Sequence, residues 1–150
     1  KGSANYVLTS DGTDIAWAAA AGGPSQANQT AIEGETNQDT YVPPDLIKHS
    51  PGVAKFWIKF EGDGSAINAS YNAASLTDSN VGNWTVLIDV DFSGAHYCLV
   101  HSFETATAAE AHLRLDGNPA GSEFYVGFFD SSNTRADPDS VMFAGFGDQA

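Results

Sequence analysis

The chain has 150 residues, of which 42% are hydrophobic, and this is enough for one globular core and about one domain. Its 6 basic and 19 acidic residues give a net charge of -13, which repels phosphate backbones and anionic membranes and so excludes nucleic-acid binding. Cys98 is the only cysteine, so an intrachain disulfide is excluded. No apolar run approaches the length of about 20 residues that spans a bilayer, so we expect no membrane insertion.

The chain divides by its patterning into three parts. Residues 1–24 predict the end of a shaft, made of a short β-hairpin and a linker, and residues 25–52 predict a polar collar with little helix. Residues 53–150 contain short apolar runs separated by Gly, Asn, Asp and Ser, which predict a β-sandwich head with a jelly-roll-like order of strands. The fold class predicted from the sequence is therefore all-β. Because the chain starts with Lys1, we expect the natural N-terminus to lie upstream.

The first predicted element is a hairpin over residues 5–18, turning at Asp11-Gly12, a dipeptide favoured in tight turns. An isolated two-stranded hairpin is marginal in water, so its apolar side chains need a partner. Three copies of the hairpin in a threefold shaft would bury Val7, Leu8 and Trp17 against one another. The alternative is that the hairpin packs on the head of its own chain.

The collar predicts one short helix that begins after Ser25 as the N-cap and ends at Gly34. Pro43-Pro44 then forces extended chain, and residues 45–48 predict a final turn. Three lysines follow within a few positions of one another in this acidic chain, and we expect them to meet carboxylates or to be solvated: Lys48, Lys55 and Lys59.

The sequence of the head predicts strands at regular spacing. The first begins at Val53, where apolar and polar residues alternate in VAKFWIKF. Further strands are predicted at residues 66–76, 84–92, 95–103, 111–115, 123–130 and 141–146. Trp84, Val86 and Ile88 share one face of their strand, as do Phe124, Val126 and Phe128. These two faces predict most of the core.

Two loops of the head, residues 78–84 and 131–140, have the composition of a shallow sugar site, because together they combine hydrogen-bonding side chains with one aromatic ring. Trp84 fits a ring platform and a core position equally well. The candidate receptor-binding residues are Tyr71, Asn80, Asn83, Trp84, Tyr125, Asn133 and Arg135. The candidate ligands for a calcium ion, which prefers hard oxygen donors, are Asp130, Asp137 and Asp139; the alternative is a solvated turn without a cofactor.

The passage from the collar into the head resembles the C-terminal region of bacteriophage tail fibres and tail-fibre-like virion proteins. The similarity covers about residues 25–103, and the matching positions are Glu33, Val42, Pro44, Ala54, Lys55, Trp57, Tyr71, Asn72, Ser75, Thr77, Asp78, Gly82, Trp84, Thr85, Val86, Phe92, Ser93, Tyr97 and Cys98. This resemblance implies a homotrimer in an extracellular virion fibre, joined to other fibre proteins upstream, with a head that contacts a glycan or protein receptor on the host.

Signals for catalysis are weaker. The chain has no Gly-x-Ser-x-Gly elbow, and mid-strand Cys98 is expected to be a small buried hydrophobe. Asp89 and Asp91 are expected on one face of their strand, the arrangement of a paired-carboxylate glycosidase. We therefore expect a trimeric, non-enzymatic adhesion tip. The alternatives are a polysaccharide hydrolase or esterase on the same trimer and a virion decoration without a ligand.

Overall fold

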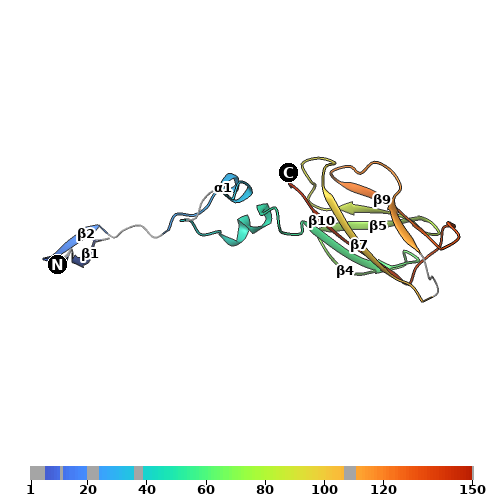
Figure 1. The fold of residues 1–150 in the computed structure, drawn as a ribbon, viewed down its shortest axis with the longest axis horizontal. Coiled ribbons are helices and arrows are strands. Elements are labelled where there is room, and N and C mark those ends of the chain that lie inside the picture. The colour runs from blue at the N-terminus through green and yellow to red at the C-terminus, as the bar shows by residue number, and fades with distance from the viewer. Residues whose placement is uncertain (1–5, 11, 20–23, 36–38, 107–110, 150) are drawn as a thin grey trace. The chain divides into compact units, whose positions relative to one another are not determined.

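The computed structural model describes residues 6–10, 12–19, 24–35, 39–106 and 111–149. The chain separates into two compact units, Lys1–Leu46 and Ile47–Ala150, which we describe one at a time (Figure 1). Within the described residues, no helix has the length and apolar character needed to cross a membrane.

The hairpin predicted near the N-terminus is present. Strand β1 (Tyr6–Ser10) pairs antiparallel with β2 (Ile15–Ala19), and Leu8 lies opposite Trp17. Gly12 in the connecting turn has φ 94°, a conformation that glycine adopts at little cost; Asp11, the other residue of the predicted turn, lies outside the described residues. The large apolar side chains of the hairpin are all exposed: Tyr6, Val7, Leu8, Ile15 and Trp17.

The collar contains the short helix that the sequence predicts, but the helix begins later. Helix α1 (Gln29–Glu33) is capped by Asn28, whose side-chain oxygen accepts from the N–H of Ala31 at 2.9 Å, so the prediction of Ser25 as the N-cap is wrong. Gly34 ends the helix as expected. The predicted turn after the two prolines is the 3-10 helix η1 (Pro44–His49).

The head is a sandwich of two antiparallel four-stranded sheets (Figure 1). The first, which we call the β3 sheet, has the order β4-β3-β10-β7 and consists of β3 (Phe56–Glu61), β4 (Ile67–Tyr71), β7 (Cys98–Glu104) and β10 (Ser140–Phe146). The second, the β9 sheet, has the order β5-β6-β9-β8 and consists of β5 (Ala73–Asn80), β6 (Asn83–Ile88), β8 (His112–Leu115) and β9 (Glu123–Phe129). The all-β prediction is confirmed.

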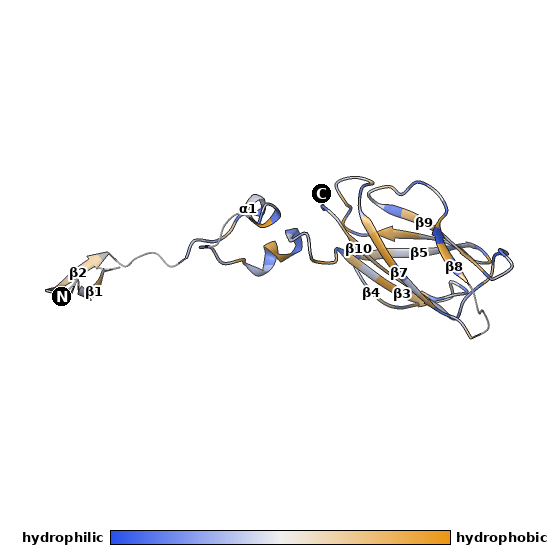
Figure 2. Ribbon diagram, in the orientation of Figure 1, coloured by the Kyte–Doolittle hydropathy of each residue, from blue (hydrophilic) through white to orange (hydrophobic). Residues whose placement is uncertain are grey.

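The core lies between the two sheets and is rich in aromatic rings. Trp84 packs edge-on against Phe60 with ring centroids 5.5 Å apart, and Phe124 lies 5.2 Å from Phe143. The residues come from alternate positions of the strands, as the period of two requires. Figure 2 shows hydrophobic residues along the strands of the head. The most completely buried side chains are those predicted from alternation, including Phe56, Ile58, Phe60, Trp84, Val86, Phe124, Val126 and Phe128.

The strand predicted over residues 66–76 is two strands, β4 and β5, which belong to different sheets. The chain passes between them at Asn72, which has φ 53° and whose side chain holds the crossing in place. Its Nδ2 donates to the carbonyls of Lys55 at 3.0 Å and Val90 at 3.1 Å, and its Oδ1 accepts from the N–H of Val90 at 2.7 Å. One asparagine therefore joins the two sheets at this end of the sandwich.

Two of the three lysines have defined partners in the head. Lys59 pairs with Glu104, with Nζ and Oε2 3.3 Å apart, as expected for a lysine in an acidic chain. Lys55 is buried instead, and its Nζ donates to the carbonyl oxygens of Lys48 and Ser50. A buried ammonium that donates to carbonyls fixes the entry of the chain into β3.

Candidate functional site

The outward side of the β9 sheet brings together several of the predicted receptor-binding residues. Asn83 and Gly127 are register partners, and Arg114 lies opposite Gly127 on the other side. Tyr125 lies two residues from Gly127 on β9 and so points to the same side. Arg135 reaches this side from the loop after β9, where it forms a bridge with Phe129. We call this surface, made by Asn83, Arg114, Asp116, Tyr125, Phe129 and Arg135, the arginine face.

Two guanidinium groups meet at the ring of Phe129. The Cζ of Arg114 lies 4.0 Å and that of Arg135 4.9 Å from the ring centroid, distances typical of cation–π contacts. The ring of His112 stacks on the same phenylalanine at 5.3 Å. Phe129 is thus covered, with 6% of its surface exposed, by cationic and imidazole groups rather than by apolar ones.

One carboxylate lies between the two arginines. Asp116 pairs with Arg135 through Oδ2, and its Oδ1 lies 3.6 Å from Nη2 of Arg114. The two guanidinium groups and the single carboxylate have a formal charge of +1, in a chain whose net charge is -13. The arginine face therefore places two guanidinium groups together in an acidic chain, with Glu123 as a further carboxylate beside Tyr125.

Tyr125 supplies an exposed ring beside the arginines. It is 38% exposed, and its Oη donates to Oε1 of Glu123 at 2.6 Å. This hydrogen bond, together with the negative charge of Glu123, raises the pKa of the Tyr125 phenol, so the ring stays neutral over the physiological range. Gly117 lies against one side of the ring. The ring thus offers a neutral aromatic surface and a polar edge.

The two loops predicted as the sugar site contact each other directly. Nη1 of Arg135 donates to the carbonyl of Gly82 at 2.9 Å, and the N–H of Gly82 donates to Oδ1 of Asp137 at 2.6 Å. Asn80 lies opposite Asn83 in the turn between β5 and β6, and Asn133 lies in the facing loop with φ 58°. Asn80, Asn83, Asn133 and Arg135 thus belong to one end of the β9 sheet.

Trp84 does not belong to this surface. Its relative exposure is 0%, and its ring packs between the sheets against Phe60, so the prediction of a receptor-binding Trp84 is replaced by the core alternative. The reason is its register: Trp84 pairs with Val126, and both side chains point inward, whereas the neighbouring pair of Thr85 and Tyr125 points outward.

Tyr71 lies on the other sheet, apart from the rest of the predicted set. It is 55% exposed at the end of β4 and lines a hollow of about 350 Å³ together with Lys48, Asn72, Asp89, Val90 and Gln149. Asn72 and Gln149 use their amide groups to hold the carbonyl of Val90, at 3.1 and 3.0 Å respectively. Much of the polar lining of this hollow is therefore committed to the fold.

The three aspartates proposed as calcium ligands are not brought together as one site. Oδ1 of Asp130 accepts from the N–H groups of Ser132 and Thr134, both at 2.9 Å, which closes the turn of the loop. Asp137 accepts from Gly82, and Asp139 lies next to β10. Across the described ranges, no group of three or more His, Cys, Asp or Glu side chains is arranged to hold a metal ion.

The residues that gave weak indications of catalysis in the sequence are placed differently in the structure than expected. Strand β6 ends at Ile88, so Asp89 and Asp91 follow the strand rather than sharing one face of it. Cys98 begins β7 instead of lying within a strand, and its side chain is exposed, so the prediction of a buried hydrophobe is wrong. The cause is that β7 is an edge strand, and Cys98 points away from the core.

A second hollow of about 350 Å³ opens between β7 and β8, the edge strands of the two sheets. Its lining is mainly apolar and includes Leu99, Leu113, Leu115 and Phe143, with Arg114 and His101 among the polar side chains. Tyr97 at one end is stacked on Phe92 at 4.2 Å, and burial, followed by the charge of Glu123, raises its pKa to about 12. Arg114 belongs both to this hollow and to the arginine face.

The sequence alone missed Arg114, Asp116 and Phe129. Arg114 and Asp116 are two residues apart, and the period of a strand places such residues on one side, so their pairing was available from the spacing. The contact of Arg135 with this group could not be predicted from the spacing, because it depends on how the loop after β9 folds back onto the sheet.

Comparison with known proteins adds one similarity in structure. No protein-family model matches the chain, and no curated protein matches it. A crystal structure of the phiAB6 tailspike, determined in complex with three-repeated oligosaccharides of Acinetobacter baumannii surface polysaccharide, is similar with a TM-score of 0.43 and 13% identity. The similarity covers 61% of this chain and 20% of the tailspike chain. At this score the match assigns no function to the chain.

Proposed function

We propose that this chain is the trimeric tip of a bacteriophage tail fibre, and that the arginine face of each head adheres to a glycan on the surface of the host cell. The observation that carries adhesion is the exposed ring of Tyr125 beside two arginines, within a chain of net charge -13. A flat ring packs on the apolar side of a sugar, while guanidinium and amide groups donate to its hydroxyl or carboxylate oxygens.

The trimer is supported by the hairpin. All of its large apolar side chains are exposed, and Leu8 and Trp17 lie opposite each other at 59% and 53% exposure. Two strands with no buried face are not stable alone, whereas three copies bury these side chains against one another. Three heads on one shaft also multiply a weak contact, because the second and third heads bind at a high effective concentration. The residue pattern shared with tail fibres agrees with this assembly.

A direct test is binding to an array of bacterial surface polysaccharides, with Tyr125→Ala and Arg114→Gln as variants. Tyr41→Ala is the matched control, because Tyr41 is an exposed tyrosine outside the head, at 53%. We expect each head variant to weaken binding by about tenfold or more, as for a residue at the centre of an interface, and the control to bind normally. Normal binding by both head variants would overturn the proposed site.

The competing functions give different results. A hydrolase would release reducing ends from the polysaccharide, and Asp89→Asn would stop the release; adhesion without turnover leaves the polymer intact. A virion decoration would form the trimer and bind none of the polysaccharides. The mass of the purified chain in solution is measured first, because the multivalent mechanism needs three copies.

A further inference from the structure

The outward side of the β3 sheet differs sharply from the arginine face. In one row across its four strands, Tyr71 lies opposite Trp57, Trp57 opposite Ala144, and Ala144 opposite Val100. Phe146 and Cys98 form a neighbouring pair on the same side. We call these six residues the apolar band.

Three of the large side chains of the band are exposed, and Phe146 is partly buried. Tyr71 is 55% exposed, Trp57 42% and Val100 49%, and Cys98 is also exposed. Their partners on the inward side, such as Phe56, Ile58 and Phe143, already fill the core, so the band is an addition to what the sandwich itself needs. A continuous apolar row on an exposed sheet is typical of a surface that contacts another protein.

The charges on and around the apolar band indicate which kind of molecule can bind to it. The four strands of the β3 sheet contain two carboxylates, Glu61 and Glu104, and both lie opposite Ser140 at one end of the sheet. Glu104 is paired with Lys59, and Glu61 accepts a hydrogen bond from Asn68 at 2.5 Å. The band itself has no charged residue. A basic partner would be attracted to the acidic loops elsewhere, whereas a neutral apolar surface is where two molecules of charge -13 can approach each other.

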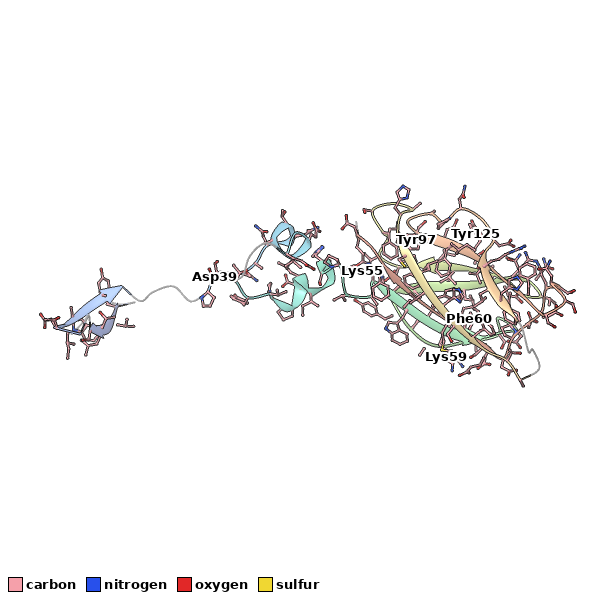
Figure 3. The ribbon with its side chains drawn as sticks, viewed as in Figure 1. Asp39, Lys55, Lys59, Phe60, Tyr97 and Tyr125 are labelled. Carbon is pink, nitrogen blue, oxygen red and sulfur yellow. The ribbon has the colours of Figure 1, made fainter. Side chains whose placement is uncertain are left out.

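We propose that the apolar band is the surface by which the heads of three copies of this chain pack around a common axis. This inference rests on the proposed trimer and goes beyond it, because it assigns one sheet to assembly and leaves the other, with the arginine face, directed at the host. Figure 3 shows the two directions: Lys59 of the β3 sheet and Tyr125 of the β9 sheet lie on opposite sides of the head. Tyr71 is then an assembly residue and not a receptor-binding one.

The single cysteine makes the inference measurable without any substitution. Cys98 is exposed at the start of the edge strand β7, at the rim of the band and outside its central row, so a spin label attached there reports the separation of the heads without filling the contact between them. Four strands about 4.8 Å apart place the two outer strands about 14 Å from each other, so three such sheets facing one axis keep equivalent residues within about 30 Å. We expect one sharp distance in this range by pulsed electron paramagnetic resonance. A trimer whose labels are farther apart than this would overturn the inference and leave the proposed trimer intact.

A pair of matched variants separates the band from the opposite sheet. Trp57 and Tyr125 are both outward aromatic residues, 42% and 38% exposed, on inner strands of their sheets. Trp57→Glu places a carboxylate at the axis in each copy, so we expect the short Cys98 distance to disappear, while Tyr125→Glu leaves it unchanged. A short distance that survives Trp57→Glu would contradict the inference. If the unmodified chain is a monomer by light scattering, the proposed trimer and this inference both fail.

Discussion

Replacing Trp84 with alanine separates the two roles that its sequence allows, because a core residue and a ring platform fail in different ways. The side chain is fully buried and packs edge-on against Phe60 at 5.5 Å. A buried tryptophan removes about 200 Å² from water, which at about 25 cal/mol per Å² corresponds to about 5 kcal/mol. Partial collapse of the cavity reduces the expected loss of unfolding free energy to about 3–5 kcal/mol.

The assay is urea unfolding followed by far-ultraviolet circular dichroism, at one fixed protomer concentration because association stabilises the folded state. Trp84→Phe is the informative companion, since Nε1 of Trp84 is buried and has no hydrogen-bond partner among the described residues. Phenylalanine keeps most of the packing and removes that unpaired donor, so its loss should be well below that of alanine. A loss below about 1 kcal/mol for Trp84→Ala, with glycan binding abolished, would refute the core assignment.

Two further predictions concern the end of the sandwich where the sheets join and the edge hollow. Asn72→Ala should lower the free energy of unfolding by about 2–4 kcal/mol, because it removes the hydrogen bonds to Lys55 and Val90 and leaves an alanine in a backbone conformation with positive φ. A loss below about 1 kcal/mol in the same urea assay would contradict this. For Tyr97, burial raises the folded pKa from 10.0 to about 12, so its stabilising effect is complete below pH 10 and is lost as pH rises toward 12. Tyrosinate absorbance should show a late step near pH 12 that Tyr97→Phe removes, while Tyr125, whose pKa is also raised, still titrates in that variant; a variant with an unchanged titration would disprove the assignment.

Alternation of apolar residues was sufficient to predict the strands of the head and most of its core. Phe56, Ile58 and Phe60 are buried because they occupy every second position of a strand with one side against the other sheet. The same period could not say where a strand stops. Residues 66–76 read as one strand, but Asn72 adopts a positive φ and the chain crosses to the other sheet.

The sequence also could not predict which side chains are exposed at the edges of the sheets. Cys98 has the neighbours of a buried strand residue, Tyr97 and Leu99, but it starts an edge strand and points outward. Whether a strand lies at an edge depends on the order of strands in the sheet, and that order is set by contacts between segments far apart in the chain.

Composition and local pattern by themselves determined that this chain is an acidic all-β protein, with an N-terminal hairpin, a short helix ending at Gly34 and a head with an aromatic core. These features depend on charge, turn residues and a period of two, all of which are local. The tertiary structure decided which polar residues meet. It buried Trp84, brought Arg135 across to Asp116 and Phe129, and separated Tyr71 onto the other sheet. Such contacts depend on which strands pair in a sheet and on the path of the loop after β9. The residues next to each other in the sequence do not determine either.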